Sequence, residues 1–258
     1  MLSGAEVDAR AALAEELARW AMGRIVAGRP SGDQISTKTS AADWVTETDL
    51  AVERRVREVL RERFPADRIV GEEYGETGGT DPSATWYIDP VDGTTNFVHG
   101  LPLSSFSIAV RDEDGAVAGA VADPYRDEIL SAVRGRGARR NGEPIRCSDA
   151  VSLVGGIFLT ELSMQSLWAG QAALMASLAD AGCVTRILGS NALSLASVGA
   201  GRALATIVDY NLVDGQAGTL VAAEAGAVVR FAGKGVLCAA PGVADAVDAL
   251  WREARNGD

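Results

Sequence analysis

The sequence predicts an α+β protein whose layers follow the order helix, sheet, helix, sheet, helix. Apolar residues recur at helical spacing in two segments near the N-terminus, and short apolar runs bounded by turn residues follow them. After about residue 150, strand and helix patterns alternate as far as Arg255. This change of rhythm divides the chain into an N-terminal α+β lobe, residues 1–148, and a C-terminal α/β lobe, residues 149–258.

Two amphipathic helices are expected at the N-terminal end. The apolar face of the first consists of Leu13, Leu17, Trp20 and Ala21. Glycine, proline and serine residues between positions 28 and 32 end this helix. The apolar stripe of the second consists of Val52, Val56, Val59 and Leu60. Thr48 or Asp49 is placed to cap its start.

Short apolar runs then predict the strands of a first sheet. They are Arg68–Gly71, Trp86–Ile88, Ser105–Val110, Ala116–Ala122 and Glu128–Val133. Residues 111–115, Arg-Asp-Glu-Asp-Gly, are a natural hairpin connection between the third and fourth runs. We therefore expect neighbouring, largely antiparallel strands.

The second half of the chain predicts a sheet with helices on its faces. A strand near Leu153–Leu159 precedes a helix around Gln165–Ala181, and a strand at Val184–Leu188 leads to a helix that begins near Ser190. A further strand, helix, strand and helix follow. The alternation accounts for the last two sheet and helix layers.

Composition excludes several classes of function. A net charge of −11 argues against nucleic-acid binding, which needs clustered Lys and Arg. The acidic N-terminus does not resemble a signal peptide, and no run of about 18 apolar residues predicts a membrane span, so we expect a cytoplasmic protein. Cys147, Cys183 and Cys238 are too widely spaced for a zinc site or a disulfide framework. His99 is the only histidine, which argues against a histidine-based triad or a multi-histidine metal site.

The segment from Trp86 to Phe97 carries the strongest chemical signal. An apolar strand ends in Asp89, and Pro90 prevents a regular continuation of the ladder. Asp92 follows, and Gly93 allows a close turn into a helix whose free N–H groups favour an anion such as phosphate. Two carboxylates beside such a turn suit hard divalent cations that bridge to a phosphate.

Further acids occur in similar settings. Glu72 follows an apolar strand, whereas Asp49 and Asp214 stand at the starts of helical segments. Asp49 and Asp214, each taken alone, are more typical of a helix cap than of a functional site. Their recurrence at strand exits and helix starts indicates a shared crevice.

Taken in order, these motifs resemble the inositol monophosphatase family. The matching segments are Asp43-x-Val-Thr-x-x-Asp49, Gly71-Glu-Glu73, Asp89-Pro-Val-Asp-Gly-Thr-Thr-Asn-Phe97, Asp123-Pro124, Gly135–Gly142, Gly189-Ser-Asn-Ala192, Asp214 and Glu224-Ala-Gly226. The resemblance runs from about Lys38 to Ala227. It implies a five-layered αβαβα sandwich of the inositol monophosphatase and fructose-bisphosphatase type, magnesium-dependent hydrolysis of a phosphate monoester, and a homodimer.

The resemblance also implies a set of metal ligands. Glu72 and Asp89, with the carbonyl group of Val91, would hold one Mg²⁺ ion. Asp89, Asp92 and Asp214 would hold a second, and a third, weaker ion would share Glu72. Mn²⁺ is expected to substitute for Mg²⁺.

The remaining roles concern water and substrate. Thr94 and Asp49 would position the attacking water, and Gly93, Thr94 and Thr95 would donate N–H groups to the phosphate. Lys38 matches a family lysine close to the site. His99 lies in a matching stretch and is expected to be structural.

The sequence departs from the family on the side of the leaving group. Ile207 stands where the family has a sugar-contacting glutamate, and Asp209 would replace it if the loop is shortened. We expect Asn191, Asp209 and Tyr210 to line this side. Inositol phosphate therefore competes with histidinol phosphate, fructose 1,6-bisphosphate and 3′-phosphoadenosine 5′-phosphate as the substrate. A non-catalytic family member is the remaining alternative.

Overall fold

A computed structural model describes residues 2–28, 30–31, 34–38, 43–79, 83–162 and 166–256. The helices are α1 (Gly4–Ala27), α2 (Glu47–Arg63), α3 (Thr94–His99), α4 (Gln171–Asp180), α5 (Asn191–Gly199), α6 (Leu212–Glu224) and α7 (Ala244–Asn256). The strands before residue 150 are β1 (Ile35–Thr37), β2 (Trp44–Thr46), β3 (Arg68–Gly71), β4 (Gly75–Thr77), β5 (Thr85–Asp92), β6 (Ser105–Asp112), β7 (Gly115–Asp123), β8 (Glu128–Val133), β9 (Ala138–Arg140) and β10 (Glu143–Ile145). Those after it are β11 (Ile157–Thr160), β12 (Val184–Ile187), β13 (Ala205–Asp209), β14 (Val228–Ala232) and β15 (Gly235–Ala239).

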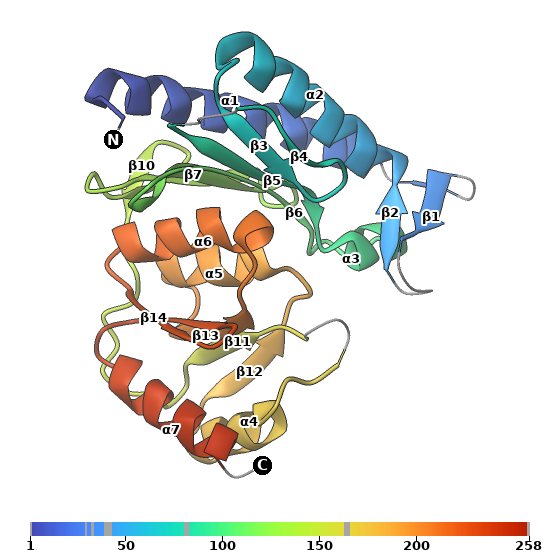
Figure 1. The fold of residues 1–258 in the computed structure, drawn as a ribbon. Helices are drawn as coiled ribbons and strands as arrows, with labels where there is room; N and C mark the ends of the chain where they lie inside the picture. The colour runs from blue at the N-terminus through green and yellow to red at the C-terminus, as the bar shows by residue number, and fades with distance from the viewer. Residues whose placement is uncertain are drawn as a thin grey trace.

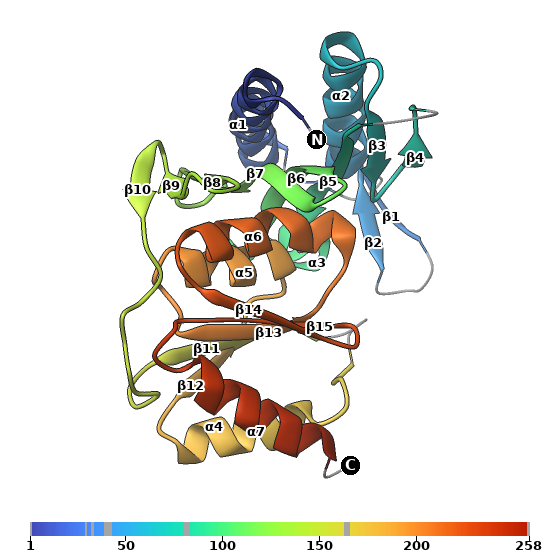
Figure 2. The same ribbon diagram turned by 60° about the vertical axis from the view of Figure 1, so that its left-hand side comes forward.

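The elements stack in five layers, as the sequence predicts. Helices α1 and α2 cover one face of an eight-stranded sheet, and α5 and α6 cover its other face (Figure 1). The turned view shows the same two helices lying on a five-stranded sheet, whose far face is covered by α4 and α7 (Figure 2). The fold is therefore an αβαβα sandwich in which α5 and α6 are shared by both sheets. The division into lobes at residues 148 and 149 stays a prediction.

The strand order explains how the acids reach one edge. The large sheet runs β10-β9-β8-β7-β6-β5-β3-β4, and β3 is parallel to β5. The C-terminal ends of β3 and β5 therefore lie side by side. Pairing of β5 with β6 shifts between Asp89 and Asp92, so Pro90 produces an irregularity, and the strand resumes at Asp92 opposite Ser105.

The two N-terminal helices begin with reciprocal capping boxes, in which the cap side chain and the third helical residue exchange hydrogen bonds. The cap of α2 is Thr46, so the predicted cap at Thr48 or Asp49 is wrong by two or three residues. Asp49 is the third helical residue of the box. In α1, Trp20 is 37% exposed because it lies at the edge of the apolar stripe, whose centre runs through Ala14 and Ala21.

The C-terminal half differs from the prediction at its boundaries. Strand β11 begins at Ile157 because residues 153–156 form a turn, in which the N–H of Gly156 donates to the carbonyl oxygen of Leu153 (3.0 Å). The next helix, α4, begins at Gln171, six residues later than expected, and residues 163–165 lie outside the described part. The last predicted strand is a hairpin of β14 and β15. No helix of the described residues is long and apolar enough to span a membrane.

Candidate active site

Three aspartates converge where the eight-stranded sheet meets the middle helix layer. Asp89 and Asp92 come from the irregular end of β5, and Asp214 comes from the first turn of α6. One carboxylate oxygen of each lies within 4.8 Å of the others. Helix α6 packs on β5, β6 and β7, and this packing brings Asp214 to a pair of acids more than 120 residues earlier in the sequence.

The chemistry of this cluster fits a cation. Burial, followed by the charges of Glu72, Asp92 and Asp214, raises the pKa of Asp89 well above its usual range. Burial and the charge of Asp92 do the same for the pKa of Asp214, whose Oδ1 is buried without a hydrogen-bond partner. The N–H of Val91 donates to Asp89 Oδ1 (3.0 Å), and Asn191 Nδ2 donates to Asp214 Oδ2 (3.1 Å). Converging oxygen ligands with an orphaned, buried oxygen suit a hard divalent ion such as Mg²⁺.

Asp92 is the most strongly hydrogen-bonded member of the cluster. Its Oδ2 accepts bonds from the hydroxyl group of Ser190 and the N–H of Ala192 (2.8 Å). Burial raises the pKa of Asp92 to about 6, and these donors oppose the rise. The bonds fix the direction of one oxygen and leave Oδ1 available.

Glu72 follows β3 directly and lies beside the acids of β5. Its N–H donates to the carbonyl oxygen of Ile88 (3.1 Å), and its exposed side chain accepts a bond from Lys38 Nζ (2.8 Å). The same ammonium group binds Glu73 (2.6 Å). Lys38 therefore places a positive charge beside Glu72 and Glu73, next to the aspartate cluster.

Asp49 and Thr94 form a separate pair at the starts of α2 and α3. The hydroxyl group of Thr94 lies 3.2 Å from Asp49 Oδ1 and 3.0 Å from the carbonyl oxygen of Val91. The N–H of Thr46 donates to Asp49 Oδ2 (3.0 Å), and this bond holds the carboxylate in place. Burial raises the pKa of Asp49 to about 6.

The turn between β5 and α3 requires glycine. Gly93 has a φ of +89°, a conformation that side chains disfavour. A Cβ atom there would lie 2.8 Å from the carbonyl oxygen of Gly189 and 2.9 Å from that of Leu103. The close approach brings the start of α3 against the turn before α5.

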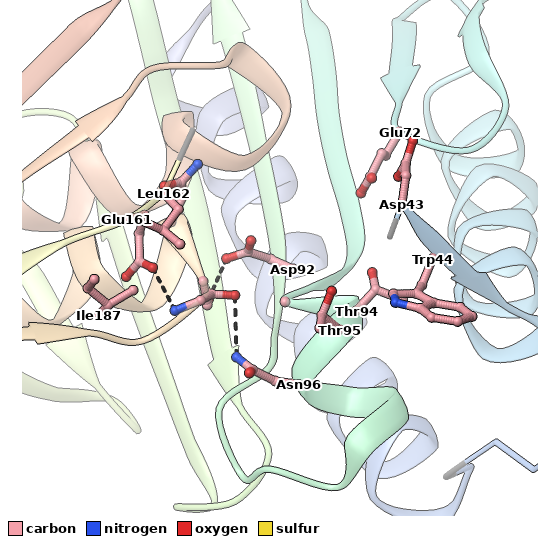
Figure 3. A pocket seen from close by; sticks show the side chains of 14 residues that line it. Asp43, Trp44, Glu72, Asp92, Thr94, Thr95, Asn96, Glu161, Leu162 and Ile187 are labelled. Carbon is pink, nitrogen blue, oxygen red and sulfur yellow. Dashed lines mark hydrogen bonds between the residues drawn. The ribbon is translucent and has the colours of Figure 1, made fainter. Parts of the chain in front are cut away.

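Glu72, Asp92, Gly93 and Thr94 line a cavity of about 360 Å³ (Figure 3), whereas Asp89 and Asp214 are not part of its lining. Its lining consists of Asp43, Trp44, Glu72, Asp92, Gly93, Thr94, Thr95, Asn96, Glu161, Leu162, Ile187, Gly189, Ser190 and Asn191. Six residues predicted from the sequence are in this set, namely Glu72, Asp92, Gly93, Thr94, Thr95 and Asn191. The wall that carries Glu161 also carries Leu162 and Ile187, each 42% exposed.

The structure does not place Asp209 or Ile207 in this cavity. Both residues line a separate one of about 240 Å³, with Trp168, Lys234 and the end of α7. Side chains alternate along β13, so Ile207 packs in the core beside α4 and α7, whereas Val208 faces α5 and α6. Ile207 is only 1% exposed. The assignment of Asp209 to substrate binding has no support in this arrangement.

Sequence reasoning overlooked Glu161. This residue follows the apolar strand β11, the same signal that pointed to Glu72. The individual roles of Asn96 and Ser190 were not predicted from the sequence either, although both residues lie in motifs that match the family. Their contacts join segments more than 80 residues apart, which periodicity does not reveal.

Known proteins resemble this chain over most of its length. Residues 6–255 match the model of the inositol monophosphatase family. The chain belongs to this family. The inositol-1-monophosphatase of Mycobacterium leprae is 37% identical to it over 243 residues, which cover 85% of this chain and 82% of that protein.

Two further relatives extend the comparison. The Nus factor SuhB of Pasteurella multocida is 40% identical over 200 residues, or 76% of this chain and 75% of that protein. The solved structure of an IMPase from Thermotoga maritima has a TM-score of 0.84 and 31% identity, and covers 94% of this chain and 96% of that chain. The five-layered fold is thus shared with solved members of the family.

Proposed function

We propose that this protein is a magnesium-dependent phosphomonoesterase that hydrolyses a small phosphate ester. The observation that carries the proposal is the convergence of Asp89, Asp92 and Asp214 beside a cavity of about 360 Å³ that Asp92 and Glu72 line. These three acids repel one another, and burial makes their ionisation costly, so a cation offsets both effects. Membership of a phosphatase family supports the same conclusion.

The ligand assignments combine the three converging aspartates with Glu72 and Val91, which the family resemblance adds. Asp89, Asp92 and Asp214 would hold one Mg²⁺ ion, and Glu72, Asp89 and the carbonyl group of Val91 would hold another. A third, weaker ion would share Glu72, and Mn²⁺ would substitute. Bound Mg²⁺ would neutralise phosphate charge and lower the pKa of a water molecule, which would remove the need for a histidine base.

The protein groups position the water and the ester. Thr94 and Asp49 would orient the attacking water, because the threonine hydroxyl group and the buried carboxylate face each other. The N–H groups of Gly93, Thr94 and Thr95, at the start of α3, would bind the phosphate oxygens. Lys38 would maintain positive charge beside Glu72.

The alcohol part of the ester would lie against the wall formed by Leu162, Ile187 and Asn191. Leu162 and Ile187 offer no hydrogen bond to a ring hydroxyl group, so a strong preference for inositol 1-phosphate is not expected. Histidinol phosphate, fructose 1,6-bisphosphate and 3′-phosphoadenosine 5′-phosphate remain alternative substrates. The homodimer remains a prediction.

The name Nus factor, carried by SuhB of Pasteurella multocida, points to a different role for that relative. The net charge of −11 argues against nucleic-acid binding by this chain. We therefore retain the phosphatase as the proposed function.

Turnover of p-nitrophenyl phosphate, followed with a panel of small phosphate esters, tests the proposal. Activity should require Mg²⁺ or Mn²⁺ and disappear in excess EDTA, and the family resemblance adds inhibition by lithium. Undiminished turnover in EDTA would refute a metal-dependent mechanism, and no turnover of any ester with Mg²⁺ would favour the non-catalytic alternative.

A further inference from the structure

Glu161 is a buried carboxylate that lines the cavity but has no assigned role. It follows β11 and is 5% exposed. Oε1 accepts bonds from the N–H of Leu188 (3.1 Å) and the hydroxyl group of Ser194, and Oε2 accepts the N–H of Gly189 (2.6 Å). Glu161 thus binds both backbone N–H groups of the turn between β12 and α5, together with the first helical turn after it.

The same turn is held from the opposite side by Asn96. Its side-chain amide donates to the carbonyl oxygens of Leu188 (2.7 Å) and Leu103 (2.9 Å). Figure 3 shows Glu161 and Asn96 with Asp92 around this piece of backbone. Leu188 and Gly189 therefore donate their N–H groups to Glu161 on one wall of the cavity. The carbonyl oxygen of Leu188 accepts a hydrogen bond from Asn96 on the other wall.

The next residues of the turn bind the proposed metal ligand. Ser190 donates its hydroxyl group to Asp92 Oδ2, and Ala192 donates its N–H to the same oxygen. The path from Glu161 through Gly189 and Ser190 to Asp92 is continuous in hydrogen bonds and backbone. A shift of the turn would rotate the Asp92 carboxylate away from Asp89 and Asp214.

Burial of the Glu161 carboxylate costs more free energy than an ordinary turn requires. All three of its donors are neutral, and no Lys or Arg of the described residues forms a salt bridge with it. Burial raises its pKa to about 7, and the donors oppose this rise. A buried carboxylate without a counter-ion costs free energy, but it accepts three bonds at once with strong directional preference.

We propose that Glu161 is a positioning residue, which fixes the turn at Leu188–Ser190 and thereby directs the Asp92 carboxylate toward the proposed metal site. The inference rests on the proposed function, because it assigns Asp92 to a metal. Partners of metal ligands of this kind change metal affinity or activity by about 10- to 100-fold when they are removed.

A double-mutant cycle with Ser190 tests the path. In Glu161→Gln, an NH₂ group takes the place of the oxygen that accepts the N–H of Leu188 or Gly189. Ser190→Ala removes the hydroxyl group that donates to Asp92. Mg²⁺ affinity is measured by isothermal titration calorimetry, and kcat with p-nitrophenyl phosphate at saturating Mg²⁺. We expect each single variant to weaken Mg²⁺ binding about tenfold. The double variant should bind Mg²⁺ no more weakly than the single variant with the lower affinity, because both substitutions act on one carboxylate.

Glu224→Gln is the matched control. Glu224 also accepts two backbone N–H groups, those of Gly135 (2.7 Å) and Gly137 (2.8 Å), but it does not line this cavity. This variant should lower the melting temperature without changing Mg²⁺ affinity. If Glu161→Gln fails to fold, Ser194→Ala removes one donor to Glu161 and should weaken Mg²⁺ binding about threefold.

Mg²⁺ affinity of Glu161→Gln within about twofold of wild type, or additive effects in the cycle, would overturn the proposal. Unchanged affinity in Ser194→Ala would do so where Glu161→Gln is unfolded. Calorimetry separates this outcome from failure of the proposed function. A wild-type protein that binds Mg²⁺ but hydrolyses no ester would refute the phosphatase and leave the positioning of Asp92 measurable.

Discussion

Asp89 and Asp214 offer the most direct test at the scale of single residues. Changing either to asparagine removes a ligand charge with little change in shape. We expect Asp89→Asn and Asp214→Asn to reduce kcat by at least about a hundredfold, while each protein stays folded and melts at a higher temperature than wild type in EDTA at pH 8. Burial and, after it, the repulsion between neighbouring carboxylates raise both pKa values, and the asparagine variants relieve both effects.

Asp209→Asn is the matched control, because Asp209 lies in the separate cavity with Ile207 and Trp168. Its kcat with p-nitrophenyl phosphate should stay within about twofold of wild type. Steady-state kinetics and thermal melts measure both effects. A ligand variant that keeps more than about a tenth of wild-type kcat, a barrier change under about 1.4 kcal/mol, would remove that residue from the metal site.

Thr94 tests the positioning of water. Its hydroxyl group lies between Asp49 and the carbonyl oxygen of Val91, and valine preserves the shape without the hydroxyl group. Thr94→Val should lower kcat by about 10²- to 10⁴-fold, the usual contribution of a group that transfers or orients a proton. Thr94→Ser should retain at least a tenth of wild-type activity. Equal losses in the two variants would show that the methyl group, not the hydroxyl group, matters.

The sequence revealed acids more readily than their partners. Asp89 and Glu72 were recognisable because each directly follows a short run that predicts a strand, a signal that lies within a few residues. The bond from Ser190 to Asp92 spans 98 residues, and the one from Asn96 to Leu188 spans 92. Such bonds depend on how layers pack, which local patterns do not specify. The family resemblance supplied the order of the motifs but not these contacts.

Gly93 provides a test at the scale of the element, since it joins β5 to α3. Gly93→Ala should destabilise the protein by at least about 2 kcal/mol more than Gly142→Ala and should abolish Mg²⁺-dependent turnover. Gly142 has a similar φ, +85° against +89°, but an added Cβ atom there meets nothing within 4 Å. The difference between the two variants therefore isolates the contact with Gly189 and Leu103.

Urea unfolding of both glycine variants measures the difference in free energy. Gly142→Ala should lose only the left-handed conformational term, about 1–2 kcal/mol, and keep its activity. Equal destabilisation by the two substitutions would mean that the turn adjusts without strain and that the close approach is not required.

The predicted boundaries of helices and strands were wrong where particular hydrogen bonds, rather than apolar periodicity, determine where an element begins or ends. The cap of α2 moved to Thr46 because its hydroxyl group accepts the N–H groups of Thr48 and Asp49. Strand β5 passes through Pro90 because pairing with β6 resumes at Asp92, although proline cannot donate to the ladder. The layers themselves were predictable, since apolar spacing determines which face of each element is buried.

At the scale of the whole molecule, the site lies where two sheets share one helix layer. The first sheet supplies Asp89 and Asp92, whereas α5 and α6 supply Asn191 and Asp214. Helix α6 packs against β7 on one side and β14 on the other. The relative position of the ligands therefore depends on the packing of the middle layer, and a charge that disturbs this packing disturbs the site.

The pH dependence of stability follows from the same acids. Burial raises the pKa of Asp49 to about 6 and that of Glu161 to about 7, and it raises the pKa of Asp89 and Asp214 well above their usual range. A carboxyl group with a raised pKa binds its proton more tightly in the folded state. Its contribution to stability is complete below the unfolded pKa, near 4, and is lost as the pH rises through the folded value.

In EDTA, the melting temperature should therefore fall by at least about 5 °C between pH 5 and pH 7.5. Saturating Mg²⁺ should reverse the trend, because metal binding requires the ionised carboxylates and becomes stronger as they lose their protons. Asp214→Asn removes one of the raised groups and should flatten the curve in EDTA. Calorimetric or fluorescence melts across this range, with and without Mg²⁺, measure the effect. A melting temperature in EDTA that is constant or rises with pH would show that these acids are ionised without a cation, and the metal-binding interpretation of the cluster would lose its physical basis.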